Sequence, residues 1–373
     1  MINEDRLLKL FKRLCLINAP SLKERESVDC VKQYLMEIGL DVEEDAAGEK
    51  IGGKAGNVIA TLKGTAPGAP RVFLSAHFDT VEPTEGLVID EKGGILFSAS
   101  DTILGADDKA GMAPAIEAVN ALVETGAPHG DVTLLLTVAE EIGLKGADAL
   151  DIEALGLDYG YVLDTGPPVG TFVTRTATHD RIDVVVQGTP AHSGKNPEDG
   201  VSALEVAADA IHHMRLGRID ADTTANFGLI QGGTAVNVVC PILKLRGEAR
   251  STSVEKLDAQ IDHMVQEFER AARERGATVV IDHDRHYSSF QIDGDSPVVA
   301  RAQRASAKLG LQQGLRTTLG GSDANIFNAK GVPSIVIATG MDHIHTHDEC
   351  VSRADLVDTA RLAYEILVDV TSG

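Results

Sequence analysis

Val72-Phe73-Leu74-Ser75-Ala76-His77-Phe78-Asp79 is the stretch that decides the fold of this chain. Its first five residues predict a short buried strand, and the polar residues His77 and Asp79 follow directly after the end of that strand. Three more apolar runs end in polar residues in the same way: Val132–Ala139 ends in Glu140 and Glu141, Tyr159–Leu163 ends in Asp164, and Ser334–Ala338 is followed by His343, His345 and His347.

The four runs predict one polar crevice. Strands that deliver histidine and carboxylate side chains at the same end place them along one edge of an α/β sheet, where such folds bind ligands. Histidine nitrogens and carboxylate oxygens, without a cysteine cluster, suit zinc, cobalt or manganese. The pattern therefore predicts a metal-dependent hydrolase.

Length and composition narrow the class of protein. A chain of 373 residues exceeds one typical core, so we expect two domains. The formal net charge of -22 argues against nucleic-acid binding, which needs a basic face. The charged start predicts no signal peptide, and no window approaches the ~20 apolar residues of a membrane span. Four scattered cysteines fit free thiols in a reducing cytoplasm.

The character of the sequence changes near residue 178. From there the pattern predicts a strand, a helix, two strands, a helix and a strand, which is the ferredoxin-like order βαββαβ. Helix–strand alternation then resumes, with helices at 297–309, 322–330 and 353–370. We therefore expect a discontinuous catalytic domain, residues 1–178 and 291–373, made of a mixed sheet flanked by helices. An α+β lid or dimerisation domain is inserted at residues 179–290.

Two acidic pairs are candidate metal or proton-transfer groups. Gly105-Ala106-Asp107-Asp108-Lys109 opens a predicted helix, where a carboxylate either caps the helix or bridges two metals. Glu140 and Glu141 follow a buried strand and point to opposite sides, so one would bind metal while the other transfers a proton. The alternative for this second pair is a solvated acidic loop.

The last candidates have less specific surroundings. Asp164 stands at a strand-to-turn transition, where aspartate is also a common turn former. His343, His345 and His347 alternate, so an extended chain would aim all three in one direction. Their spacing alone does not decide which of them binds a metal.

These motifs resemble the zinc-dependent exopeptidases that include peptidase T, glutamate carboxypeptidase and succinyl-diaminopimelate desuccinylase. The resemblance covers essentially the whole chain. It is carried by Ser-Ala-His-Phe-Asp-Thr at 75–80, Gly-Ala-Asp-Asp-Lys at 105–109, Glu140-Glu141, Asp164, and His345 with Glu349 four residues on.

The resemblance implies a two-metal site, with zinc as the expected ion and cobalt or manganese as alternatives. His77 and Asp164 would bind one ion, Glu141 and His345 the other, and Asp107 would bridge both. His345 is chosen over its neighbours because the family has a glutamate four residues after its ligand histidine. Asp79 would orient His77, Glu140 would be the general base and acid, and the Asp107–Asp108 peptide would be cis.

The inserted segment carries further family marks. Gly188–Gly194 resembles the segment whose histidine, here His192, reaches the active site of a partner subunit and stabilises the oxyanion, which implies a homodimer. Asn237 and Arg250 resemble substrate-binding residues of the lid, and Gly320 belongs to a loop that lines the pocket. Surface positions for His192 and Arg250 are the alternatives.

The form of the motifs is most similar to peptidase T, which implies an aminopeptidase acting on short peptides. A glutamate-type carboxypeptidase, in which Arg250 grips the substrate carboxylate, and an N-acyl amino acid deacylase are the alternatives within the family. A catalytically silent metal-binding protein would lack a ligand or the base, and the sequence lacks neither.

Overall fold

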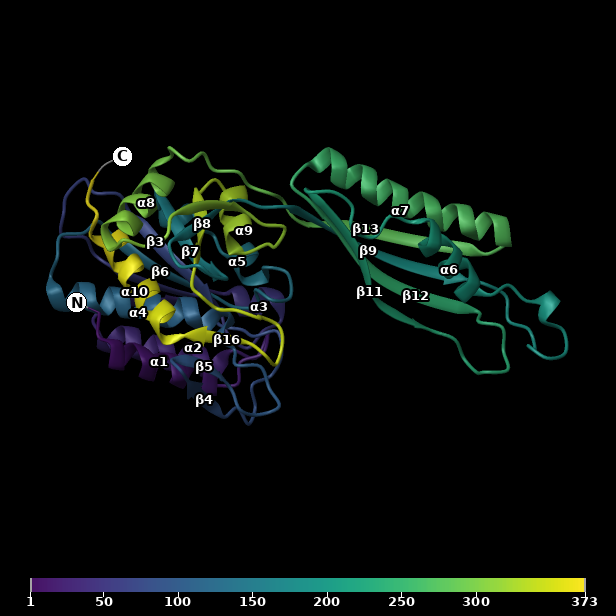
Figure 1. Ribbon diagram of the computed structural model, residues 1–373, viewed down its shortest axis with the longest axis horizontal. Coiled ribbons are helices and arrows are strands. Elements are labelled where there is room, and N and C mark those ends of the chain that lie inside the picture. The colour runs from purple at the N-terminus through teal and green to yellow at the C-terminus, as the bar shows by residue number, and fades with distance from the viewer. Residues whose placement is uncertain (1, 372–373) are drawn as a thin grey trace. The chain divides into compact units, whose positions relative to one another are not determined.

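The computed structural model describes residues 2–371, which form two compact units (Figure 1). The first unit comprises the chain up to Thr174, Phe290–Thr317 and the chain from Ser322 onward. The second comprises Arg175–Ser289 and Thr318–Gly321. Each unit has its own hydrophobic core.

The first unit is built on an eight-stranded mixed sheet in the order β1-β2-β6-β3-β7-β15-β8-β14. Its four central strands, β6, β3, β7 and β15, are mutually parallel and adjacent. These are the four strands predicted from the apolar runs, so their carboxyl ends meet at one edge. The strands of this sheet are β1 (Asp41–Glu44), β2 (Val58–Leu62), β3 (Val72–His77), β6 (Val132–Thr137), β7 (Tyr159–Thr165), β8 (Thr171–Arg175), β14 (Gly314–Thr317) and β15 (Ser334–Ala338).

Helices cover both faces of this sheet, because its central strands are apolar on both sides. Leu74 belongs to the main core, as do buried residues of the long helix α4. Its neighbour Phe73 points the other way and meets Phe327 of α9 edge to face, with ring centroids 5.3 Å apart. The helices of this unit are α1 (Glu4–Leu16), α2 (Arg25–Glu37), α3 (Ala47–Ile51), α4 (Ala106–Thr125), α5 (Lys145–Ala149), α8 (Pro297–Leu309), α9 (Asp323–Ala329) and α10 (Arg353–Val368), with a 3-10 turn, η1, at Glu153–Leu155.

A small three-stranded sheet completes the first unit. Its strands β4 (Ile89–Lys92) and β5 (Ile95–Ser98) form a hairpin that turns at Gly93-Gly94, and β16 (Cys350–Ser352) pairs with β5. The predicted α/β class, a mixed sheet flanked by helices, is therefore confirmed.

The second unit has a five-stranded antiparallel sheet in the order β10-β11-β12-β9-β13. Without the short edge strand β10 this is the predicted βαββαβ order. The role of this unit as a lid stays a prediction. Its elements are β9 (Thr178–Gln187), η2 (Pro197–Asp199), α6 (Ala203–His213), β10 (Gly217–Arg218), β11 (Thr223–Gly232), β12 (Ile242–Ser251), α7 (Val254–Arg275) and β13 (Thr278–Tyr287).

One detail of the sequence prediction is wrong. The segment with the three alternating histidines is not extended, because His343 and His345 have left-handed backbones, with φ of 53° and 62°. The three side chains consequently do not share one direction. No helix within residues 2–371 is both long and apolar enough to cross a membrane.

Candidate metal centre

The polar residues at the carboxyl ends of the central strands form a cluster in the first unit. It contains two groups of three residues each. Within each group, the possible ligand atoms all lie within 4.8 Å of one another. His77, Asp107 and Asp164 make one group, and Asp107, Glu141 and His345 make the other. Asp107 is the member that the two groups share.

The two carboxylate oxygens of Asp107 face different histidines. Oδ1 lies 3.2 Å from Nε2 of His77, and Oδ2 lies 3.1 Å from Nε2 of His345. The same nitrogen of His345 lies 3.2 Å from Oε2 of Glu141. A carboxylate that turns one oxygen to each group has the arrangement needed to bridge two ions.

The cluster contains more carboxyl groups than histidine side chains that could carry a positive charge. Burial raises the pKa of Asp164, and the negative charge of the neighbouring Asp107 raises it further. Burial also raises the pKa of Glu140. In the opposite direction, the carboxylates of Asp107 and Glu141 raise the pKa of His345 to about 10. Oε1 of Glu141 is buried and has no hydrogen-bond partner in the described part of the chain. A carboxylate buried without a partner is costly, and bound cations would remove that cost.

Asp79 holds both His77 and the acidic pair. Nδ1 of His77 lies 3.0 Å from the backbone carbonyl of Asp79 and 3.4 Å from its Oδ1. The Asp79 carboxylate also accepts hydrogen bonds from the backbone N–H groups of Glu140 and Glu141, at 3.0 and 3.1 Å. Such outer contacts fix the orientation of a ligand histidine and of the residues beside it.

The start of α4 is held by Glu349. Its carboxylate accepts hydrogen bonds from the backbone N–H of Gly105 at 2.6 Å and of Asp107 at 2.9 Å. Burial raises the pKa of Glu349 to about 7. The peptide between Asp107 and Asp108 is cis, as the resemblance implied.

The other two histidines of the triplet lie outside the cluster. His343 faces Asp342, and His347 faces Glu82 and Asp101. The structure therefore separates three residues that sequence spacing left equivalent, and it brings His345 alone to Asp107.

Sequence reasoning gave no role of its own to a buried acid beside the cluster. Asp323, at the start of α9, accepts a hydrogen bond from the Thr137 hydroxyl at the end of β6, and burial raises its pKa to about 6. In the sequence it follows Gly320-Gly321-Ser322, where an aspartate looks like an ordinary helix start. The burial of a residue in a glycine-rich loop leaves no signal in its spacing.

In the second unit, His192 and Asn237 lie on adjoining loops. The backbone N–H of Ser193 donates to the carbonyl of Asn237 at 3.0 Å, and His192 forms a β-bridge with Val238. Both His192 and Asn237 are exposed. The two segments that carry the family resemblance in this unit are thus neighbours.

Arg250 is held by an acid of its own strand. Its Nε and Nη2 donate to the two oxygens of Glu248 at 3.1 and 3.0 Å, and Nη1 lies 3.4 Å from the carbonyl of Leu319. Gly320, the next residue, donates its N–H to the Thr318 hydroxyl at 3.0 Å. Arg250 and Gly320 are therefore close in space, and much of the guanidinium is already occupied.

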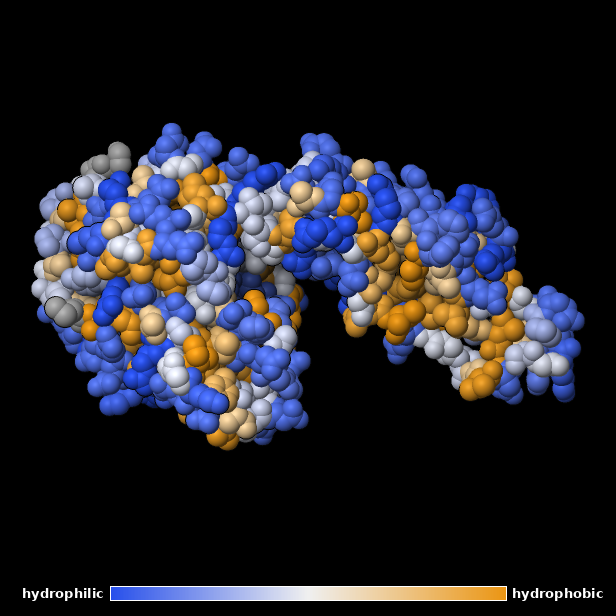
Figure 2. Space-filling model, viewed as in Figure 1, coloured by the Kyte–Doolittle hydropathy of each residue, from blue (hydrophilic) through white to orange (hydrophobic). Residues whose placement is uncertain are grey.

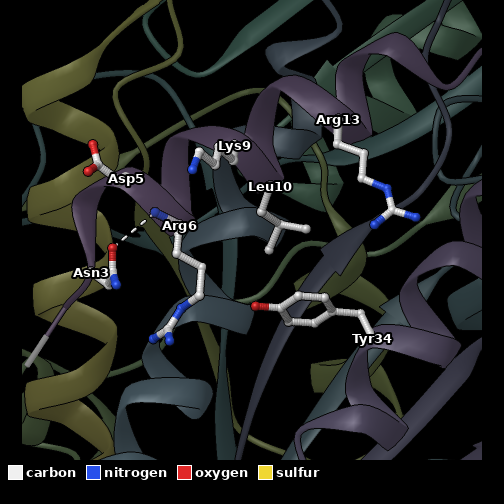
Figure 3. Close-up of a pocket in the computed structure, with 7 residues that line it drawn as sticks. All are labelled: Asn3, Asp5, Arg6, Lys9, Leu10, Arg13 and Tyr34. Atoms are coloured by element: carbon white, nitrogen blue, oxygen red, sulfur yellow. Dashed lines mark hydrogen bonds between the residues drawn. The ribbon is translucent and has the colours of Figure 1, made fainter.

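A separate pocket of about 480 Å³ lies along α1 (Figure 3). It is lined by Arg6, Lys9 and Arg13 of α1 and by Tyr34 of α2, among others. None of the clustered histidines or acids lines it. This pocket is therefore separate from the cluster at the strand ends.

Comparison with known proteins identifies the family to which this chain belongs. Residues 73–369 match the model of Peptidase family M20/M25/M40, and the chain belongs to that family.

Three relatives match almost the whole chain. The crystal structure of aminopeptidase PepT from Bacillus cereus is 39% identical, has a TM-score of 0.89 and covers 99% of both chains. That of a tripeptidase from Staphylococcus aureus is 37% identical, has a TM-score of 0.94 and also covers 99% of both chains. The uncharacterized protein YqjE of Bacillus subtilis is 39% identical over 98% of this chain and 99% of its own length.

Proposed function

We propose that this protein is a metal-dependent aminopeptidase that removes the N-terminal residue from tripeptides and other short peptides. The observation that carries the proposal is the likeness, over 99% of both chains, to an aminopeptidase and to a tripeptidase at 39% and 37% identity. The cluster of histidines and acids at the strand ends supports a hydrolytic centre at the place where this fold binds ligands.

The cluster fits two divalent ions. His77 and Asp164 would hold one ion, Glu141 and His345 the other, and Asp107 both. The surplus of buried acids and the unpartnered Oε1 of Glu141 support this fit. Nitrogen and oxygen donors suit zinc, which we propose as the ion, ahead of cobalt and manganese. Bound ions would polarise the scissile carbonyl and make a water nucleophilic near neutral pH.

Glu140 would move the proton. Burial raises the pKa of its carboxylate above the ordinary value of a glutamate, and glutamates that act as general bases and acids commonly have a raised pKa. It would take a proton from the attacking water and deliver it to the nitrogen of the departing amine. Asp79 would keep this geometry by holding the backbone of Glu140 and the ring of His77.

We also propose that the protein is a homodimer in which His192 stabilises the oxyanion in the partner's active site. Leu229 and Ile230 of β11 support an interface on the second unit, because they are 63% and 61% exposed. They line a groove of about 470 Å³, and Figure 2 shows hydrophobic residues gathered over β11 and β12. Sedimentation of the purified protein tests the oligomeric state. A cytoplasmic location, which we propose too, fits four free cysteines.

The carboxypeptidase alternative depends on Arg250. The two hydrogen bonds from Arg250 to Glu248 leave less of its charge for a substrate carboxylate, which disfavours that alternative. Asn237 and Gly320 remain proposed substrate contacts in either case.

The test uses one tripeptide in three forms: free, N-acetylated and C-amidated, each with zinc or cobalt. We expect turnover of the free and amidated forms and loss of turnover on N-acetylation, with no turnover after dialysis against a chelator. Loss only on C-amidation would contradict the proposal and indicate a carboxypeptidase. Release of acetate from the acetylated form would indicate a deacylase.

A further inference from the structure

Residues 19–24, between α1 and α2, run beside the strand ends that carry the metal-centre candidates. The backbone N–H of Thr80 donates to the carbonyl of Ala19 at 3.1 Å, and Pro20 forms a parallel bridge with Thr80. This short segment is therefore anchored next to His77 and Asp79, although more than fifty residues separate them in the sequence.

Two side chains of the segment support the turn that contains Glu140 and Glu141, Glu24 directly and Ser21 through Asp79. The Ser21 hydroxyl donates to Oδ2 of Asp79 at 2.6 Å, and that same oxygen accepts the backbone N–H of Glu141 at 3.1 Å. Oε1 of Glu24 accepts the backbone N–H of Ala139 at 3.1 Å. The backbone of the turn is thus held at three consecutive residues by Asp79 and Glu24 together.

Ala139 needs such support. Its φ of 53° is in the left-handed region, which costs a residue with a Cβ about 1–2 kcal/mol. Oε1 of Glu24 also accepts the N–H of Leu22 at 2.7 Å, and Leu22 has a φ of 70°. One carboxylate oxygen therefore stabilises two left-handed residues that lie in different parts of the chain.

The side chain of Glu24 does not cap its own helix, α2. It stands at the N-cap position of α2, but its side chain makes no capping hydrogen bond there. It is fully buried, with a relative exposure of 0%, and its Oε2 has no hydrogen-bond partner among residues 2–371. A buried carboxylate that leaves its helix uncapped and binds a distant turn has a role outside the helix.

We propose that Ser21 and Glu24 are positioning residues for the reaction, which set the backbone of residues 139–141 and through it the side chains of Glu140 and Glu141. The inference rests on the proposed function, since it assigns the turn a base and a metal ligand. Without the acceptor at Glu24, Ala139 relaxes from its left-handed conformation and both glutamates shift. Losses at such outer contacts are typically ten- to a hundredfold in metal affinity or activity.

The experiment compares Glu24→Ala, Glu24→Gln and Ser21→Ala with the wild type. For each, kcat and KM on a tripeptide and the two steps of zinc binding by calorimetry are measured on folded protein. We expect Glu24→Ala to lower kcat about ten- to a hundredfold with little change in KM and to weaken one zinc-binding step by a similar factor. Glu24→Gln keeps an oxygen at the Oε1 position, so its kcat and its affinity in that zinc-binding step should stay within about threefold of wild type.

Glu117→Ala is the matched control. Glu117 is also a fully buried glutamate of the first unit, but it binds Arg6 and the N–H of Asn3 and lies outside the cluster. It should lower stability while leaving kcat and both zinc steps of the folded protein unchanged.

The positioning role is overturned if Glu24→Ala keeps kcat and both zinc affinities within twofold of wild type, or if Glu117→Ala produces the same losses. Failure of Glu24→Gln to recover also overturns it. Should Glu24→Ala not fold, Ser21→Ala decides the question, because it must lower kcat and weaken one of the two zinc-binding steps in a folded protein. If the wild type hydrolyses no tripeptide, the proposed function fails, while the zinc steps still test Glu24.

Discussion

Two of the buried acids of helix α4, Glu117 and Asp107, have different partners. Glu117 receives a cation from the chain itself: Nε and Nη2 of Arg6 lie 2.6 and 2.9 Å from its two oxygens, and the N–H of Asn3 adds a third contact at 2.7 Å. Asp107, at the start of the same helix, meets only two histidines and stands among other acids.

The difference supports the proposal that the clustered acids bind cations, whereas Glu117 is paired within the chain. Lys109 is buried near Asp107, but its ammonium group donates to the backbone carbonyls of Phe78 and Asp79. The clustered acids therefore lack the guanidinium partner that Glu117 has. A buried charge without a partner is retained when it binds something else, and here the donor set fits divalent cations.

The largest expected effect is that of Glu140→Gln. Loss of the proton-transfer group should lower kcat about a thousandfold, within the 10²–10⁴ range of general acid–base catalysis, while both metals remain bound. Because the change removes a buried charge, the free energy of unfolding of the metal-free protein should not fall. Steady-state kinetics, metal analysis and urea unfolding in chelator check this. A near-normal rate would contradict the role of Glu140.

Arg6→Met should have the next largest effect, on stability instead of activity. It leaves Glu117 buried without its cation, which should lower the free energy of unfolding by about 3 kcal/mol, while kcat of the folded protein stays unchanged. Lys9→Met, in the same pocket (Figure 3), is the control, because an exposed lysine should change stability by about 0.5 kcal/mol or less. Urea unfolding measures both. Equal small losses would mean that the Arg6–Glu117 pair contributes little.

The smallest expected effect concerns Glu44, an acid of β1 near the surface that also has cations of its own. Hydrogen bonds from Arg25 and Lys32 lower its pKa from 4.5 to about 2, although burial opposes the shift. A lowered pKa in the folded state contributes stability that is present above pH 4.5 and is lost as the pH falls toward 2.

Glu44→Gln should therefore cost about 1 kcal/mol at pH 7, since solvent screens such a pair, and this difference from wild type should shrink between pH 4.5 and 2. Unfolding curves at several pH values measure it. A difference that stays constant with pH would show that the charge of Glu44 is not its source.

Particular residues show how far the sequence leads. The apolar runs before His77, Glu140, Asp164 and the histidine triplet predicted four strands, and the structure makes them neighbours with parallel directions. A strand buried on both faces must be apolar throughout, so its end is visible in the sequence. Spacing alone left His343, His345 and His347 equivalent, and the extended alternation that it assumed is absent, because two of the three have left-handed backbones.

The sequence by itself determined the strands, the polar residues that follow them, the ferredoxin-like order of the second unit and the family resemblance. These depend on local periodicity and on short motifs, which each segment carries within itself. Only the tertiary structure decided that His345, and neither His343 nor His347, meets Asp107. It also decided that Glu248 occupies Arg250 and that Ser21 and Glu24 support the turn at residues 139–141. The physical reason is that these contacts join segments distant along the chain, and folding creates their proximity.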